Sequence, residues 1–120
     1  MSGAANGSGD RQAALDALLS DIASCRICRH APLGGSANAL PHEPHPVCVA
    51  SSRAPILIAG QAPGIRVHQS GRPFTDPSGD RLRDWLGVDE AQFYDRDNFA
   101  IVPMGFCFPG QDAKGDDLPP

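Results

Sequence analysis

Residues 56–87 read ILIAGQAPGIRVHQSGRPFTDPSGDRLRDWLG, and this stretch decides the fold of the 120-residue chain. Its first four residues are apolar and stop at Gly60, a pattern typical of a buried strand in a parallel sheet. Its last ten residues begin at Ser78, a good N-cap, and end at Gly87, where glycine commonly terminates a helix. Between these two points the apolar residues fall at helical spacing: Leu82, Trp85 and Leu86. The stretch therefore predicts a strand, a long loop and a helix.

The loop between this strand and helix is the candidate binding site, because ligands of open α/β sheets bind at the carboxyl ends of strands. It contains neither G-x-G-x-x-G nor G-x-x-x-x-G-K-[ST], the motifs of the common phosphate loops. Instead it reads GQAPG over residues 60–64, GRPF over residues 71–74 and DPSG over residues 76–79. The loop therefore differs from standard nucleotide sites.

The GQAPG and GRPF motifs, at this spacing, resemble the uracil-DNA glycosylase superfamily, and among its members the iron–sulfur family 4 type. The resemblance covers roughly residues 25–109. It implies an α/β fold of three layers, α/β/α, around a central parallel sheet. We expect this chain to hold an incomplete, C-terminally truncated version: a disordered tail over residues 1–9, then the N-terminal portion of the domain over residues 10–120.

The resemblance implies hydrolysis of the N-glycosidic bond of uracil, or of a related damaged base, after the base is flipped out of DNA. Pro103 stands where family 4 members usually carry an asparagine, and the chain ends before the family's histidine-containing motif. The identity of the excised base therefore stays open. The alternatives are a non-catalytic domain that binds nucleic acid or nucleotides, and an inactive fragment.

The same resemblance implies roles for the loop residues. Phe74 matches the aromatic residue that stacks on the flipped base, a contact worth about 1–3 kcal/mol; the alternative is an ordinary core phenylalanine. Asp76 could hold or deprotonate a water, although a turn aspartate that caps backbone amides explains it equally well. Gln61, the second predicted catalytic residue, cannot act as a base but can orient a water or a base edge. The predicted base-binding residues are Gly60, Gln61, Ala62, Pro63, Gly64 and Phe74.

Charge is distributed unevenly along the chain. The formal net charge is −4, which excludes a globally basic nucleic-acid-binding protein. Residues 53–83, however, carry five arginines and only two aspartates. This predicts a local positive surface that holds phosphates, although a solvated surface without function is an alternative. The predicted DNA-binding residues are Arg66, His68, Arg72 and Ser78.

Four cysteines suggest a metal or cluster site. Residues 10–24 have helical periodicity, with Leu15, Leu18, Leu19 and Ile22 on one face, and lead into Cys25-Arg26-Ile27-Cys28. This C-x-x-C pattern can be half of a metal site, a redox pair or two incidental thiols, and the preceding helix argues against the redox pair. The resemblance adds Cys107 as a third ligand of a [4Fe–4S] cluster whose fourth ligand lies outside this chain, with zinc as the alternative. Cys48 lies in an apolar run typical of a buried structural cysteine.

The remaining segments predict little chemistry. The first nine residues have no apolar region typical of a signal peptide, and no segment is apolar enough over about 20 residues to span a membrane. We therefore expect a soluble, cytoplasmic monomer whose partner is DNA with uracil or a damaged base. His42 and His45 lie in a proline-rich loop, residues 31–46, and are not assigned a role.

Overall fold

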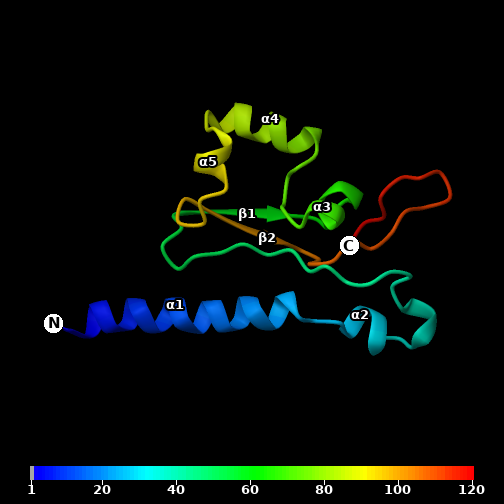
Figure 1. The fold of residues 1–120 in the computed structure, drawn as a ribbon, viewed down its shortest axis with the longest axis horizontal. Coiled ribbons are helices and arrows are strands. Elements are labelled where there is room, and N and C mark those ends of the chain that lie inside the picture. The colour runs from blue at the N-terminus through cyan, green and yellow to red at the C-terminus, as the bar shows by residue number, and fades with distance from the viewer. Residues whose placement is uncertain (1) are drawn as a thin grey trace.

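The structure is a computed structural model that describes residues 2–120, with side chains from residue 9 onward. Two strands lie at the centre of the molecule and helices lie on both sides of them (Figure 1). In chain order the elements are α1 (Ser2–Ala23), α2 (Ile27–His30), η1 (Ser36–Asn38), β1 (Ile56–Gly60), α3 (Ile65–Ser70), α4 (Pro77–Leu86), α5 (Glu90–Phe93) and β2 (Phe99–Pro103).

The two strands form a parallel sheet. In the register of β1 and β2, Ile58 lies opposite Ile101 and Gly60 lies opposite Pro103. Val49, from the segment before β1, forms an antiparallel bridge with Ile101 along the other edge of β2. Parallel strands joined by helices confirm the predicted α/β class, and β1 lies where the apolar run of residues 56–59 places it.

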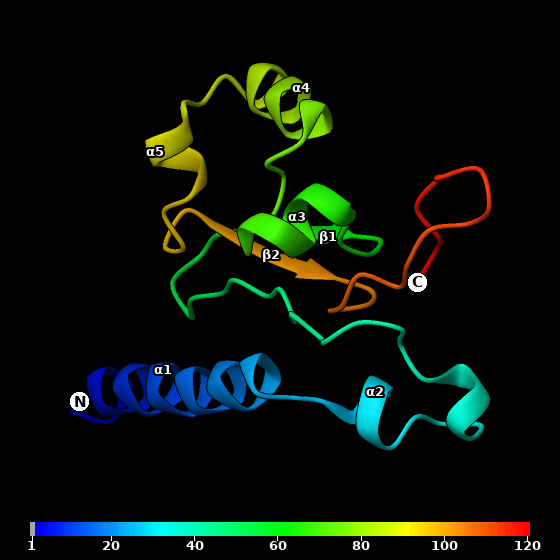
Figure 2. The same ribbon diagram turned by 45° about the vertical axis from the view of Figure 1, so that its right-hand side comes forward.

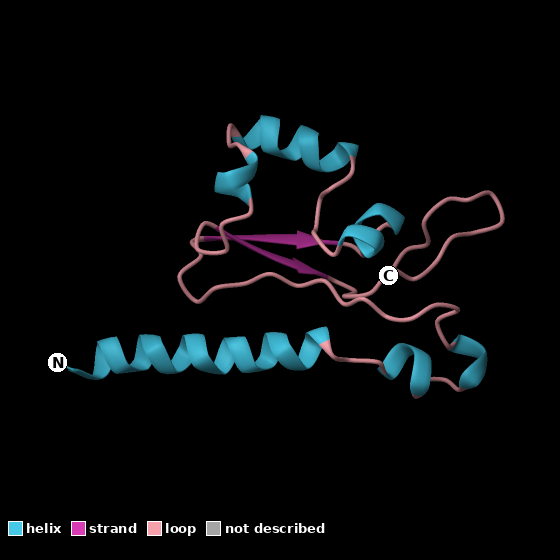
Figure 3. Cartoon of the chain, viewed as in Figure 1, coloured by secondary structure: helices cyan, strands magenta, loops and turns pink. Residues whose placement is uncertain are grey.

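The helices lie on both sides of the strands. Helices α4 and α5 lie on one side and α1 lies on the other, with the segment before β1 running between α1 and the strands (Figures 1 and 2). Long loops connect most of the elements (Figure 3), as the high glycine and proline content predicts. Polar contacts join α1 to the loops that precede β1 and β2. The Ser52 amide donates to Gln12 Oε1 at 2.9 Å, and Arg96 pairs with Asp16 at 2.9 Å.

The hydrophobic core lies between the strands and the α4–α5 side. Its centre is formed by Phe93, which is fully buried, together with Phe99 and Ile101. Phe93 and Phe99 pack with ring centroids 5.6 Å apart. The half-buried residues packed against this centre are Val49, Ile58, Phe74, Leu82, Val88 and Tyr94.

Helix α1 differs from its prediction at both the start and the buried face. It begins at Ser2 rather than at Asp10, so the segment predicted as a disordered tail is helical from Ser2 onward, and Met1 lies outside the described residues. Leu15, Leu19 and Ile22 are half-buried, but Leu18 is 54% exposed. The helix contacts the molecule along a narrow stripe, which is why Leu18 falls outside it.

Strand β1 and helix α4 are also more exposed than predicted. Ile56 and Leu57 are 47% and 63% exposed. Because successive strand residues point to opposite faces, neither face is covered by the described residues at the start of β1. On α4, Trp85 is 76% exposed, and the buried positions are those of Gly79 and Arg83. The apolar spacing of the sequence therefore located α4 correctly, and Leu82 packs against the core, but Trp85 and Leu86 stay exposed.

The caps of α4 and α5 correct and extend the prediction. Helix α4 is capped by Asp76, not by Ser78: the side chain of Asp76 accepts from the Gly79 amide at 3.2 Å. Proline at the first helical position has a φ suited to a helix start, so α4 begins at Pro77. Gly87 ends the helix in the left-handed region, as predicted. The unpredicted α5 begins with a capping box between Asp89 and Gln92, a sequence signal that could have located it.

Candidate functional site

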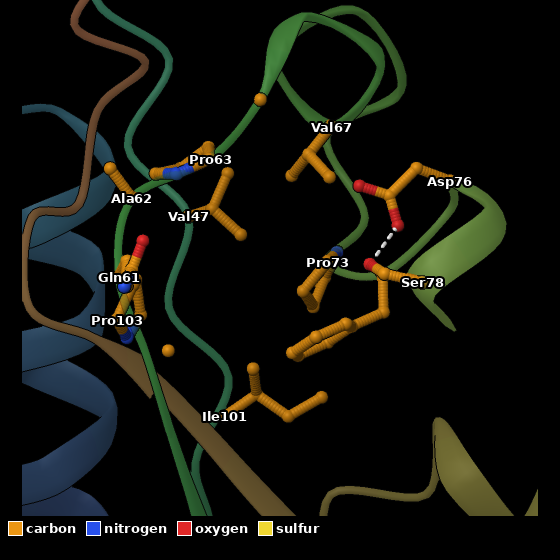
Figure 4. A pocket seen from close by; sticks show the side chains of 13 residues that line it. Val47, Gln61, Ala62, Pro63, Val67, Pro73, Asp76, Ser78, Ile101 and Pro103 are labelled. Carbon is orange, nitrogen blue, oxygen red and sulfur yellow. Dashed lines mark hydrogen bonds between the residues drawn. The ribbon is translucent and has the colours of Figure 1, made fainter. Parts of the chain in front are cut away.

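A cavity of about 240 Å³ lies at the carboxyl end of β1, where the sequence places the binding loop. Its floor and walls are mostly apolar, and its polar groups come from the loop and the start of α4 (Figure 4). Small-molecule sites typically combine an apolar recess with a few convergent polar groups. The lining residues are Val47, Gly60, Gln61, Ala62, Pro63, Gly64, Val67, Pro73, Phe74, Asp76, Ser78, Ile101 and Pro103.

All the predicted base-binding residues line this cavity, together with both predicted catalytic residues and Ser78. The sequence did not predict the apolar walls. Val47 comes from the segment before β1, Val67 from α3 and Ile101 from β2. Their only sequence signal is hydrophobicity, which does not distinguish a cavity wall from a core position. Pro103 also lines the cavity, so a proline ring borders it at the position where the resemblance implies an asparagine.

The backbone of the GQAPG loop is anchored through its carbonyl groups. The carbonyl of Gly60 accepts from the Met104 amide at 2.8 Å, and that of Gln61 accepts from the Gly105 amide at 2.9 Å. Within the described residues, no carbonyl or side chain accepts from the amides of Gln61, Ala62 or Gly64. Amides without a partner inside the protein require water or a ligand as acceptor. These donors therefore suit a ligand that presents oxygen atoms.

Phe74 belongs to both the cavity and the core. It lines the cavity, and its ring also packs edge-on against Phe93 with centroids 5.9 Å apart. Its backbone has φ +58°, in the left-handed region that L side chains rarely adopt. The two roles considered from the sequence, base stacking and core packing, are thus compatible, because the ring lies at the boundary between the two regions.

Asp76 caps α4, one of the two roles considered from the sequence, and it also lines the cavity. Its Oδ1 atom caps α4 and also accepts a hydrogen bond from the Ser78 hydroxyl, drawn as the dashed line in Figure 4. Its Oδ2 atom makes no hydrogen bond to any described residue. Oδ1 therefore caps the helix, while Oδ2 is available to accept a hydrogen bond beside the cavity. Gln61 and Asp76 also border a second, polar cavity of about 310 Å³ together with Asp117.

The predicted DNA-binding residues are dispersed. Ser78 lines the cavity, but Arg66, Arg72 and His68 are not among its lining residues. Arg66 and Arg72 are exposed, and the guanidinium carbon of Arg72 lies 3.8 Å from the centre of the Tyr94 ring. Both arginines are thus accessible from outside the cavity, as a phosphate contact requires.

His68 packs against two other histidines instead of extending into solvent. Its ring centroid lies 4.4 Å from that of His45, 4.8 Å from that of His42 and 5.4 Å from that of Phe108. Its Nδ1 atom is buried and has no hydrogen-bond partner among the described residues. Burial, assisted by the neighbouring His45 and His42, lowers the pKa of His68 below its usual value. This arrangement favours a neutral ring that packs α3 against the proline-rich loop.

Cys25, Cys28 and Cys107 line one apolar cavity of about 420 Å³, at the end of the molecule that holds α2. Cys25 follows α1, Cys28 lies in α2 and Cys107 follows β2, so the C-x-x-C segment and a segment distant from it in sequence converge there. The Leu40 amide donates to the Cys28 carbonyl at 2.9 Å, which ties α2 to the following loop. Cys48 is not among the residues that line this cavity.

Among these three thiols, Cys107 has a perturbed pKa. Burial raises the pKa of Cys107 to about 11, with smaller contributions from Cys28 and Cys25 that Arg26 partly offsets. A cation bound to the thiolates would reverse this effect. Among the described residues, no three His, Cys, Asp or Glu side chains lie close enough together to hold one metal ion. Cysteine thiolates are the usual ligands of iron–sulfur clusters, so Cys25, Cys28 and Cys107 are the residues that could hold one.

The sequence was also compared with models of known protein families. A model described as the uracil DNA glycosylase superfamily matches residues 47–119. The matched range contains every lining residue of the cavity at the end of β1 and also contains Cys107, but not Cys25 or Cys28. Among the described helices, none has the length and apolar character needed to cross a membrane.

Proposed function

The chain belongs to the uracil DNA glycosylase superfamily, and on this premise we propose that it hydrolyses the N-glycosidic bond of uracil, or of a related damaged base, in DNA. The observation that carries the proposal is the convergence of the GQAPG loop, Phe74 and Asp76 on one apolar cavity. A base extruded from the helix needs such a recess, with an aromatic face to stack on and polar groups to meet its edge.

The base would lie against Phe74 and meet the amides that follow Gly60. In the reaction the bond between the base and C1′ breaks, and its electron pair leaves on the base. Amides directed at a base oxygen stabilise this developing negative charge. The free amides of Gln61, Ala62 and Gly64 are the groups suited to this role, and the Gln61 carboxamide can orient the base edge or a water.

The free oxygen of Asp76 would act on the sugar side of the bond. As the base leaves, positive charge develops at C1′, and a nearby carboxylate stabilises it. Asp76 Oδ2 can also accept a hydrogen bond from the water whose oxygen then bonds to C1′. The departing base takes up the proton released by this water, which completes the hydrolysis. Capping of α4 through Oδ1 fixes the position of the carboxylate before the substrate arrives.

The partner of this reaction would be DNA with a damaged base. Arg66 and Arg72 supply positive charge outside the cavity, where the phosphates that flank an extruded nucleotide would lie. Ser78 lies at the cavity, and its hydroxyl can donate a hydrogen bond to a phosphate only if it gives up its hydrogen bond to Asp76. His68 is half-buried and packs against His45, an arrangement that supports α3.

We also propose the iron–sulfur type, with Cys25, Cys28 and Cys107 holding a [4Fe–4S] cluster. The support is that these three cysteines share one apolar cavity, whereas Cys48 is not part of its lining. Such a cluster would have a structural role: it would join the end of α1, the helix α2 and the segment after β2 by covalent bonds to the metal. A fourth ligand would come from outside these three cysteines.

The proposed reaction predicts an effect of the Asp76 charge. We expect purified full-length protein to release uracil from an oligonucleotide, detected as strand cleavage at the resulting abasic site. Asp76→Asn should slow excision by about a hundredfold under single-turnover conditions, within the range for a positioned acid or base. Asparagine is as good an N-cap as aspartate, so α4 should remain stable.

Asp89→Asn is the matched control, because Asp89 caps α5 and is not among the lining residues of the cavity. It should leave excision unchanged. Binding of the oligonucleotide without release of any base by the wild-type protein would instead favour the non-catalytic binding domain. Equal excision by Asp76→Asn and the wild type would remove Asp76 from the reaction.

The cluster proposal predicts colour. Full-length protein purified without oxygen should be brown and contain iron and sulfide, and Cys25→Ser should lose both. Cys48→Ser is the control and should keep them, because Cys48 does not line the cavity of the other three cysteines. A colourless wild-type protein with stoichiometric zinc would overturn the cluster while leaving these cysteines as ligands.

A further inference from the structure

The backbone at Phe74 has a conformation that needs support. Among the described residues, Phe74 is the only non-glycine residue with positive φ. Residues in such regions cost conformational energy and persist only where the surrounding structure holds them. The conformation occurs where the chain passes along the cavity wall, at Pro73 and Phe74. The contacts that maintain it therefore also control the shape of the site.

Two side chains from other elements hold this segment. Arg83 of α4 donates from Nη1 to the Phe74 carbonyl at 3.1 Å. The Tyr94 hydroxyl, directly after α5, lies 2.7 Å from the Pro73 carbonyl and 3.2 Å from the Phe74 carbonyl. A hydroxyl has one proton to donate, and the shorter distance assigns it to Pro73. Arg83 Nη1 also donates to the Tyr94 hydroxyl at 3.2 Å. We call this pair the Arg83–Tyr94 clamp.

Arg83 of the clamp is buried and Tyr94 is half-buried. Arg83 is only 7% exposed, and a buried guanidinium is costly unless its donors are satisfied. The Asp80 carboxylate supplies the counter-charge and accepts from Arg83 Nη2 at 2.8 Å, while the Phe74 carbonyl accepts from Arg83 Nη1. The aromatic rings support the same arrangement: Phe93 packs edge-on against both Phe74 and Tyr94. Arg83 is therefore committed to the loop and is not available to DNA.

The clamp also contacts a residue predicted to bind DNA. The guanidinium of Arg72 lies 3.8 Å from the centre of the Tyr94 ring, and its positive charge is attracted to the face of that ring. The exposed Arg72 and the cavity-lining Phe74 are thus joined through one tyrosine. A change in the position of Tyr94 would affect both.

We propose that Arg83 and Tyr94 are positioning residues that hold Phe74 ready to stack on an extruded base. The inference rests on the proposed function and deepens it, because it assigns the preorganisation of the stacking ring to two residues outside the loop motifs. A ring held in place before binding does not have to be ordered when the base arrives, which favours the bound state. Neither residue needs to touch the substrate.

The test is a double-mutant cycle. Tyr94→Phe removes the hydroxyl but keeps the ring that packs on Phe93 and Arg72. We expect it to lower single-turnover excision of uracil by about tenfold to a hundredfold, the range for a misplaced substrate-positioning group. The same substitution should have little further effect in a Phe74→Ala background, because the residue it positions is already gone. Arg83→Lys, which keeps the charge near Asp80, should behave like Tyr94→Phe.

Gln92→Ala is the matched control. It removes one hydrogen bond from the adjacent α5, the bond to the Asp89 amide, without touching the 73–74 carbonyls. Its effect on excision should be small and additive with Phe74→Ala. The same double-mutant cycle is also measured on the free energy of unfolding by denaturant, a measurement that requires no enzymatic activity. Coupling between Tyr94 and Phe74 there supports the clamp even if the wild type excises nothing, which would overturn only the proposed function. Additive effects of Tyr94→Phe and Phe74→Ala in an active enzyme would overturn the clamp.

Discussion

Replacing Phe74 with alanine is expected to reduce uracil excision by roughly tenfold to a hundredfold per folded molecule. The reason is the loss of a base–aromatic stack worth about 1–3 kcal/mol, since about 1.4 kcal/mol corresponds to a factor of ten. The substitution should also lower the melting temperature, because the ring packs against Phe93 in the core. Truncation of a core phenylalanine costs about 3–5 kcal/mol, and a half-buried ring should cost less than that.

Single-turnover excision and thermal melting on the same preparation separate the two effects. Leu82→Ala is the matched control, because Leu82 packs against the same core but does not line the cavity. It should lower the melting temperature without changing excision per folded molecule. Phe74→Leu should keep most of the packing but not the flat aromatic face, so it should lose excision with less loss of stability. Normal excision by folded Phe74→Ala protein would refute the stacking role.

Gly79→Ala is expected to have the second large effect, on both stability and the site. A Cβ atom at Gly79 would lie 1.8 Å from the Phe74 carbonyl oxygen and 2.6 Å from its carbonyl carbon. These are backbone atoms, so the clash cannot be relieved by a side-chain rotation and must displace Phe74 or α4. Overpacking typically costs about 1–3 kcal/mol, and this contact should cost at least the upper value. The rate of excision should fall together with the stability, because the Phe74 carbonyl held by Arg83 has to move.

Gly9→Ala provides the comparison. Gly9 lies in α1, is exposed and would have nothing within 4 Å of a new Cβ atom. Alanine is the better helix former by about 0.5–1 kcal/mol, so this variant should be at least as stable as the wild type. Denaturant unfolding and excision assays on both variants test the contrast. A Gly79→Ala protein with wild-type stability and activity would contradict the close approach of Phe74 to the first turn of α4.

Much of the local structure follows from short stretches of sequence. The apolar runs that end at Gly60 and at Pro103 form the two parallel strands, because uninterrupted apolar residues suit a strand in a parallel sheet. Gly87 ends α4 because glycine enters the left-handed region without a steric penalty. The family resemblance carried by the GQAPG and GRPF motifs also identified loop residues that line the cavity. Each of these inferences depends on residues that are neighbours in the chain.

The predictions that the structure corrected concern choices between neighbouring residues. Ser78 and Asp76 are both good N-caps, and Pro77 between them selects Asp76, because proline favours the first helical position. Leu18 and Trp85 fit the helical spacing, but the faces that contact the protein are narrow and exclude both. Spacing alone locates an apolar face but does not reveal how much of it another element covers.

Contacts between distant residues decided the rest of the site. Arg83 is one of the five arginines of residues 53–83, yet it is buried and donates a hydrogen bond to the Phe74 carbonyl. Tyr94 has no motif around it, and His68 packs against His42 and His45 from a loop without periodicity. A local pattern limits the backbone angles and caps that a segment can adopt. It does not specify which carbonyl a side chain will reach twenty residues away, because that depends on how the strands and helices pack together.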